Sequence, residues 1–109
     1  MSENRIYSFI GLARKAGKVA AGDCAVESAI KRGKAACVIL SEDASPNTEK
    51  KYLGICGAKG IPIIRFGARQ RLGEILGKEM YSVIAVTDMG FASRIEEMIQ
   101  DESNHDKLR

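Results

Sequence analysis

The sequence predicts an α/β fold, specifically a three-layer α/β/α sandwich around a four-stranded mixed sheet. Short apolar runs alternate with helical stripes of apolar residues along the chain. Glycines stand where most of these stripes end. The 109 residues are 45% hydrophobic and 28% charged, which suffices for one hydrophobic core. We therefore predict a single domain over residues 1–100, followed by a flexible polar tail over residues 101–109.

The first half of the chain predicts two helices and two strands in alternation, over residues 3–16, 19–21, 22–33 and 37–40. Apolar residues spaced i, i+3, i+4 and i+7 define the first helix, and Gly17 suits its left-handed end. Gly22 or Asp23 is the expected N-cap of the second helix, and Gly33 its C-cap. The second strand is apolar throughout, which favours a strand covered on both faces.

The second half predicts three helices and two strands, over residues 45–60, 61–66, 72–76, 83–86 and 88–99. The clearest start is Ser45, a capping residue followed by Pro46 at the first helical position and by Glu49 in the first turn. Pro62 indicates that the third strand lies at an edge of the sheet. Asp88 can cap the last helix.

Basic residues are concentrated in the first third of the chain. The formal net charge of +3 alone is too small to indicate a nucleic-acid partner. Residues 1–34, however, hold seven Lys and Arg against three Asp and Glu, whereas residues 81–109 hold three against six. Most of the surplus comes from Arg14, Lys15, Lys18, Lys31, Arg32 and Lys34. Such residues attract a phosphate backbone if the fold gathers them on one face, and otherwise are ordinary solvated surface.

Several protein classes do not fit the sequence. No apolar run approaches the ~18 residues that a membrane helix needs, and the first residues lack the apolar stretch of a signal peptide, so we expect a cytoplasmic protein. His105, the only histidine, lies in the polar tail and leaves nucleophilic catalysis without a base. The pair Glu42-Asp43 is more typical of caps or solvated loop residues than of an acid–base site. We predict no enzymatic activity, no metal and no cofactor.

The three cysteines form neither a disulfide framework nor a Cys-x-x-Cys zinc pair. Cys24, Cys37 and Cys56 are therefore interpreted as buried thiols. Because Cys24 also falls at a helix start, where the pKa of a thiol can decrease, redox sensing is an alternative for that residue.

Two segments carry a resemblance to a known family. They are Gly22-Asp23-Cys24-Ala25-Val26-Glu27-Ser28-Ala29-Ile30-Lys31-Arg32-Gly33 and Val38-Ile39-Leu40-Ser41-Glu42-Asp43-Ala44-Ser45-Pro46. The similarity continues through Gly60-Ile61-Pro62, Arg69 and Val86-Thr87-Asp88-Met89-Gly90-Phe91. In this combination the chain resembles the L7Ae/L30e ribosomal-protein superfamily, in particular its small bacterial members.

The resemblance implies a non-catalytic, ribosome-associated and monomeric protein that binds structured RNA, typically a kink-turn. The N-terminus of the second helix would enter the widened groove of the RNA. Free backbone N–H groups and the positive helix end suit phosphate there, and Gly22 allows close approach. The RNA-binding residues that the resemblance implies are Gly22, Asp23, Cys24, Ala25, Ser28, Lys31, Arg69, Lys78, Glu79 and Met80.

The chain departs from the archaeal and eukaryotic pattern at three of these positions. That pattern has Asn, Glu and Lys where this sequence has Cys24, Ala25 and Ser28. Base-edge contacts worth about 1–3 kcal/mol each should therefore be absent. We expect salt-sensitive recognition dominated by RNA shape and backbone. The alternative is a protein-interaction module of the same fold that has lost specific RNA binding.

Overall fold

The computed structural model describes residues 2–77 and 80–107, and in them the helices and strands follow the predicted order. The elements are α1 (Ser2–Lys15), β1 (Val19–Ala21), α2 (Asp23–Lys31), β2 (Cys37–Leu40), α3 (Pro46–Lys59), β3 (Ile63–Arg65), α4 (Arg69–Leu76), β4 (Val83–Val86) and α5 (Met89–Lys107). The α/β class is thus confirmed.

The four strands form one mixed sheet in the order β1-β4-β2-β3. β4 runs antiparallel to both of its neighbours, so that Ala85 lies opposite Ala20 on one side and Val38 on the other. β2 and β3 are parallel, with Val38 opposite Ile63. β3 is an edge strand, as Pro62 predicts, because proline cannot donate a hydrogen bond to a further strand.

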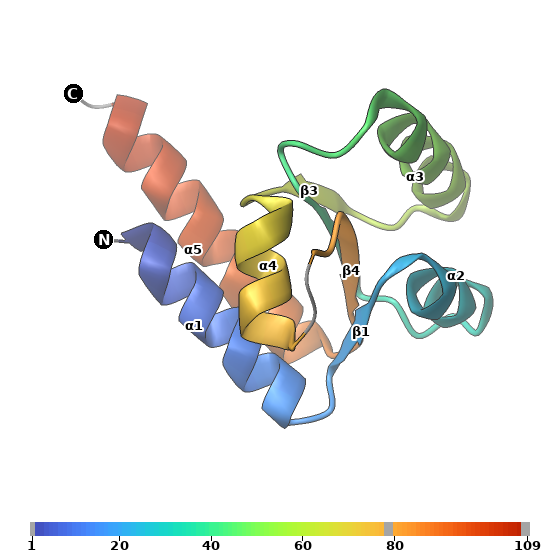
Figure 1. The fold of residues 1–109 in the computed structure, drawn as a ribbon, viewed down its shortest axis with the longest axis horizontal. Helices are drawn as coiled ribbons and strands as arrows, with labels where there is room; N and C mark the ends of the chain where they lie inside the picture. The colour runs from blue at the N-terminus through green and yellow to red at the C-terminus, as the bar shows by residue number, and fades with distance from the viewer. Residues whose placement is uncertain (1, 78–79, 108–109) are drawn as a thin grey trace.

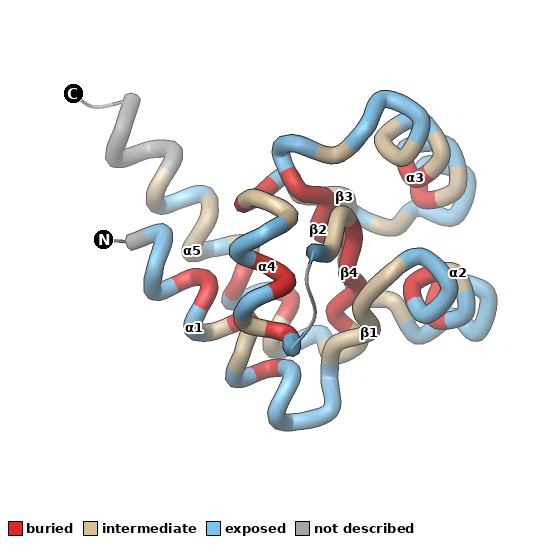
Figure 2. The backbone as a smooth tube through the Cα atoms, viewed as in Figure 1, coloured by how far each residue is buried: buried red, intermediate tan, exposed pale blue. Residues whose placement is uncertain are grey.

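Helices cover both faces of the sheet (Figure 1). α1, α4 and α5 pack on one face, and α2 and α3 pack on the other. In β2, Cys37 and Ile39 belong to the first core and Val38 and Leu40 to the second, because successive side chains of a strand point to opposite faces. β2 and β4 are buried along their whole length (Figure 2). These layers confirm the predicted sandwich.

The starts of α3 and α5 follow the predicted capping signals. The hydroxyl oxygen of Ser45 accepts a hydrogen bond of 3.2 Å from the N–H of Thr48, and proline occupies the first turn of α3. A carboxylate oxygen of Asp88 accepts a hydrogen bond of 2.9 Å from the N–H of Phe91. These side chains satisfy N–H groups that have no partner within the helix.

The ends of α2 differ in detail from the prediction. Of the two candidates for its N-cap, Gly22 occupies the position and Asp23 is the first helical residue. Arg32 is the C-cap, and Gly33 follows it with a φ of 70°. The C-cap thus lies one residue earlier than predicted. A residue with left-handed backbone conformation, here Gly33, stands just beyond the end of a helix. The helical backbone of α5 continues to Lys107, within the segment for which we predict a flexible tail.

The cysteines divide into two kinds. Cys37 and Cys56 are buried, as expected, whereas Cys24 is exposed, so the expectation of a buried thiol is wrong for that residue. Cys24 lies on the outward face of α2, which packs on the sheet through Val26 and Ile30. Burial raises the pKa of the Cys37 thiol to about 12, which keeps it protonated at neutral pH.

No helix in residues 2–77 and 80–107 is long and apolar enough to cross a membrane.

Candidate nucleic-acid interface

The N-terminus of α2 presents free backbone N–H groups to solvent. Gly22 precedes the helix and offers no side-chain cap. Among the described residues, none accepts a hydrogen bond from the N–H groups of Asp23, Cys24 or Ala25. These N–H groups and the partial positive charge of the helix end suit an anion.

Gly22 has a backbone conformation that is essentially restricted to glycine, with φ 92° and ψ 163°. Its N–H donates a 3.0 Å hydrogen bond to the carbonyl of Val83 in β4, which fixes the start of α2 against the sheet. A Cβ atom at this position would lie 3.3 Å from Cε1 of Tyr81. The Tyr81 ring therefore packs directly against the turn that opens α2.

Arg69 is connected to the same region through the backbone of Tyr81. The N–H of Tyr81 donates a 3.1 Å hydrogen bond to the carbonyl of Arg69, at the first residue of α4. The N–H of Arg69 in turn donates a 3.0 Å hydrogen bond to Oδ1 of Asp43, and its Nε lies 3.5 Å from Oδ2. The interpretation of Glu42-Asp43 as capping residues is thus correct for Asp43. The structure brings together the start of α2, residues 80–81 and the start of α4.

The negative charges of α2 are directed toward α3. Lys51 Nζ lies 3.1 Å from Oδ2 of Asp23 and 3.2 Å from Oε1 of Glu27. The hydroxyl of Tyr52 donates a hydrogen bond to the carboxylate of Asp23, and its oxygen lies 3.2 Å from the carbonyl oxygen of the same residue. Because both acids of the helix share the ammonium group of Lys51, they oppose an approaching anion less than free carboxylates would.

The hydrogen bond from the Tyr52 hydroxyl and the one from the Lys51 ammonium lower the pKa of the Asp23 carboxyl below its ordinary value of 3.8. Burial and the adjacent Asp23 carboxylate raise the pKa of the Tyr52 hydroxyl. Both groups therefore keep their neutral-pH forms, with Asp23 ionised and Tyr52 protonated.

The lowered pKa of Asp23 predicts an acid-dependent stability. Its ionised form contributes stability above the ordinary pKa of 3.8, and the contribution is lost as the pH falls through the lower pKa of the folded state. We expect Asp23→Asn to be less stable than the wild type at neutral pH, with the difference closing in acid. Urea unfolding across the pH range measures it. Asp101→Asn, at an exposed α5 carboxylate, is the control. A difference that stays constant with pH would contradict this assignment.

The outward face of α2 carries a stripe of three predicted site residues, Cys24, Ser28 and Lys31, spaced i, i+4 and i+7. Ala25 lies on the adjacent stripe, facing Lys18 and Thr87. Lys31 ends the helix, about 12 Å along the axis from the first turn at 1.5 Å per residue. Lys31 thus shares a face with the start of α2 but is not brought beside Arg69.

The remaining predicted residues lie in the connection between α4 and β4. Met80 is exposed, with 56% of its surface accessible. Its exposure makes it available to a partner, and it is not packed into the core. Lys78 and Glu79 lie outside the described residues.

Sequence reasoning missed two features of this region. One is Tyr81, which directly follows the predicted loop. An aromatic residue just before a buried strand could have indicated that it packs on this surface. The contact of Lys51 and Tyr52 with Asp23 joins positions 28 and 29 residues apart. No local pattern of the sequence marks that pairing.

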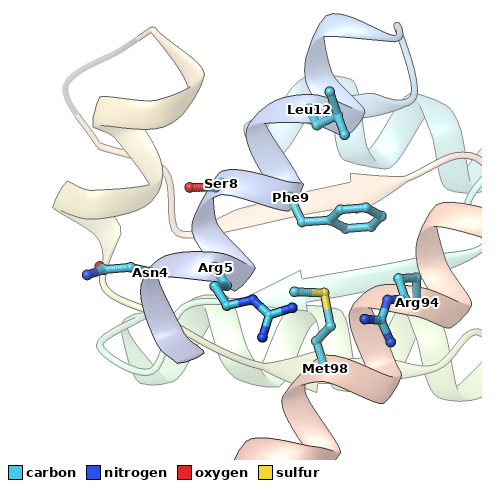
Figure 3. A pocket seen from close by; sticks show the side chains of 7 residues that line it. All are labelled: Asn4, Arg5, Ser8, Phe9, Leu12, Arg94 and Met98. Atoms are coloured by element: carbon cyan, nitrogen blue, oxygen red, sulfur yellow. The ribbon is translucent and has the colours of Figure 1, made fainter. Parts of the chain in front are cut away.

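A separate apolar hollow lies between α1 and α5, on the opposite face of the sheet from α2. Figure 3 shows Phe9 and Leu12 from α1 and Met98 from α5, with Arg5 and Arg94 beside them. It shares no residue with the start of α2 and plays no part in that interface. Among the described residues, no group of three or more His, Cys, Asp or Glu side chains is placed to hold a metal ion.

The fold and this surface define a class: a small α/β/α protein that exposes an uncapped helix end framed by an aromatic and a basic residue. Within that class, the chain belongs to the ribosomal protein L7Ae/L30e/S12e/Gadd45 family, whose family model matches residues 4–96. The resemblance inferred from the sequence is therefore confirmed.

Relatives cover most of the chain. The RNA-binding protein YlxQ of Bacillus subtilis (strain 168) is 40% identical over 95 residues, which are 87% of this chain and 95% of that protein. The large ribosomal subunit protein eL8 of Cenarchaeum symbiosum (strain A) is 31% identical over 97 residues, 88% of this chain and 77% of that protein.

Two solved structures share the fold. A protein of unknown function from Bacillus halodurans C superposes with a TM-score of 0.82 at 39% identity, covering 87% of this chain and 96% of that one. The Giardia lamblia 15.5kD RNA binding protein superposes with a TM-score of 0.71 at 19% identity, covering 92% of this chain and 86% of that one. At 19% identity, the similarity to the Giardia lamblia protein shows a shared fold alone.

Proposed function

We propose that this chain is a non-catalytic RNA-binding protein that recognises a kinked RNA helix through the N-terminus of α2. The observation that carries the proposal is the uncapped helix start at Gly22, which leaves three successive N–H groups free among the described residues. Such a helix end is a ready site for a phosphate. The names of relatives support an RNA partner, since YlxQ is an RNA-binding protein and eL8 is a ribosomal protein.

The neighbouring side chains supply complementary chemistry. Met80 is exposed and Tyr81 is half-buried beside Gly22, so an unstacked base has apolar and aromatic surface to contact. Lys31, and Arg69 with Asp43 beside it, supply positive charge for contact with the flanking RNA backbone. The exposed residues of α2, Cys24, Ala25 and Ser28, lack the long polar side chains that read base edges. Recognition therefore depends on the shape and phosphates of the RNA, and ribosomal RNA is the proposed source.

A gel-shift titration of kink-turn RNA against a straight duplex of equal length tests the proposal. We expect the kink-turn to be retained at lower protein concentration, with an affinity that decreases steeply as salt increases. Equal and negligible retention of both RNAs at low salt would refute RNA binding. A protein partner that co-purifies after ribonuclease treatment would then favour the alternative, a protein-interaction module. That alternative is motivated by Cys24, Ala25 and Ser28, which stand where the archaeal and eukaryotic pattern has Asn, Glu and Lys.

A further inference from the structure

A polar groove of about 570 Å³ lies beside the proposed interface, where α1 leads into β1 and where α2 ends. We call it the basic groove. Its lining includes Lys18, Ala25, Ser28, Arg32, Lys34 and Thr87. Positive charge and hydroxyl groups dominate its walls.

Among the described residues that line it, the basic groove has three cations and no carboxylate. Within the described part of the chain, Lys18, Arg32 and Lys34 form no ion pair. Elsewhere in the described chain, five basic residues pair with acids, namely Lys51, Arg65, Arg69, Arg71 and Arg94, whereas Arg5, Arg14, Lys15, Lys31, Lys50 and Lys59 do not. The charge of the groove is thus not balanced by the protein itself, and it attracts an external anion.

The carbonyl groups at the two helix ends beside the basic groove do not neutralise its positive side chains. α1 and α2 both end here, and carbonyls at a helix end carry partial negative charge. The N–H of Lys18 donates to the carbonyl of Ala13 at 2.9 Å, and the N–H of Lys34 donates to that of Ala29 at 2.9 Å. Because backbone donors satisfy these carbonyls, the ammonium and guanidinium groups stay available to solvent and ligands.

The groove is continuous with the proposed RNA-binding face of α2, because Ala25 and Ser28 belong to both. From this continuity we infer that the basic groove binds backbone phosphates of the same RNA, next to the segment that meets the start of α2. This inference rests on the proposed function. The lining holds no aromatic ring on which a base could stack. The ligand class is therefore the phosphodiester backbone, contacted without regard to base sequence.

A matched pair of double variants tests the inference. Lys18→Gln with Arg32→Gln removes one lysine and one arginine from the groove, and Lys50→Gln with Arg5→Gln removes the same residue types from exposed, unpaired positions of α3 and α1. Each pair changes the formal net charge from +3 to +1. The association constant for the kink-turn RNA is measured for each protein over a salt series. Far-ultraviolet circular dichroism establishes that each variant folds.

We expect the groove variant to bind about tenfold or more weakly at low salt, and its slope of log K against log salt to become shallower by roughly 1.4–1.8. The control variant should change that slope by less than about a third as much. A groove variant that matches the control would overturn the inference while leaving the proposed function intact. A wild type that retains no RNA would refute the proposed function and the inference with it. If Arg32→Gln impairs folding, Lys18→Gln with Lys34→Gln against Lys50→Gln with Lys59→Gln provides the same comparison.

Discussion

Replacing Gly67 with alanine is expected to lower the free energy of unfolding by about 3 kcal/mol, from backbone strain and overpacking together. Gly67 has a φ of 79°, which an L side chain rarely adopts. An added Cβ would lie 2.6 Å from the Tyr7 hydroxyl oxygen and 3.0 Å from its Cε1. The Tyr7 ring has little room to withdraw, because it is buried in the core and its hydroxyl accepts a 2.9 Å hydrogen bond from the N–H of Ala68.

Two other glycine substitutions separate the effect of backbone strain from the effect of overpacking. Gly60→Ala has a similar φ of 69° but open space around the Cβ, so it should cost only about 1 kcal/mol. Gly57→Ala, inside α3 with nothing within 4 Å, should stabilise the protein by about 0.5–1 kcal/mol. Urea unfolding of the three variants measures the differences. If Gly67→Ala were no more destabilising than Gly60→Ala, the close packing of Tyr7 on this turn would be refuted.

The Gly67 turn matters for function because it leads into α4. The carbonyl of Gly67 accepts a 2.8 Å hydrogen bond from the N–H of Glu42, and Arg69 begins the helix two residues later. Tyr7 and Gly67 thus fix the start of α4, where we propose that Arg69 contacts the RNA. We regard this turn as the structural support of that residue.

The second large effect concerns the three positions of α2 at which the archaeal and eukaryotic pattern has base-reading residues. The triple substitution Cys24→Asn, Ala25→Glu and Ser28→Lys is expected to raise the affinity for kink-turn RNA at least tenfold, because each good base-edge contact contributes about 1–3 kcal/mol. The net charge does not change, since one Glu and one Lys are added. Binding to a straight duplex should therefore stay within about twofold of the wild-type value.

A second variant controls for the two charges that the triple substitution adds. Leu53→Glu with Gly57→Lys adds the same two charges to α3, at an i, i+4 spacing that does not disturb the helix. It should leave the affinity for both RNAs unchanged. An equal gain for the kink-turn and the duplex, or no gain at all, would contradict the placement of these residues at a base-reading edge.

The sequence predicted those parts of the fold that local chemistry determines. Ser45-Pro46 marked the start of α3 because a hydroxyl cap and a residue without N–H suit the first turn of a helix. Pro62 indicated an edge strand because proline has no N–H group to donate to a further strand. Helical spacing placed Lys31 two turns along the second helix from Cys24. These inferences use neighbours within a few residues.

The geometry of the candidate site depended on contacts that periodicity does not encode. Tyr81 packs on Gly22, and Lys51 approaches Asp23, although each pair is separated by a helix or more of sequence. The first contact follows from the sheet order, which places the start of α2 beside the end of the α4–β4 connection. The second follows from the packing of α2 and α3 on the same face of the sheet. For Lys31, helical spacing predicted its distance along α2 from Cys24, but it did not predict that Lys31 would lie away from Arg69.

The measurement that tests the central claim most directly compares one added carboxylate at two helix starts. Cys24→Asp and Asn47→Asp each place an exposed acid in the first turn of a helix, in α2 and α3 respectively. Both acids suit the helix dipole, so neither variant should be less stable than the wild type. If the start of α2 binds RNA phosphate, Cys24→Asp should weaken kink-turn binding about tenfold or more, and Asn47→Asp by less than about twofold. Equal affinities for the two variants would contradict the account.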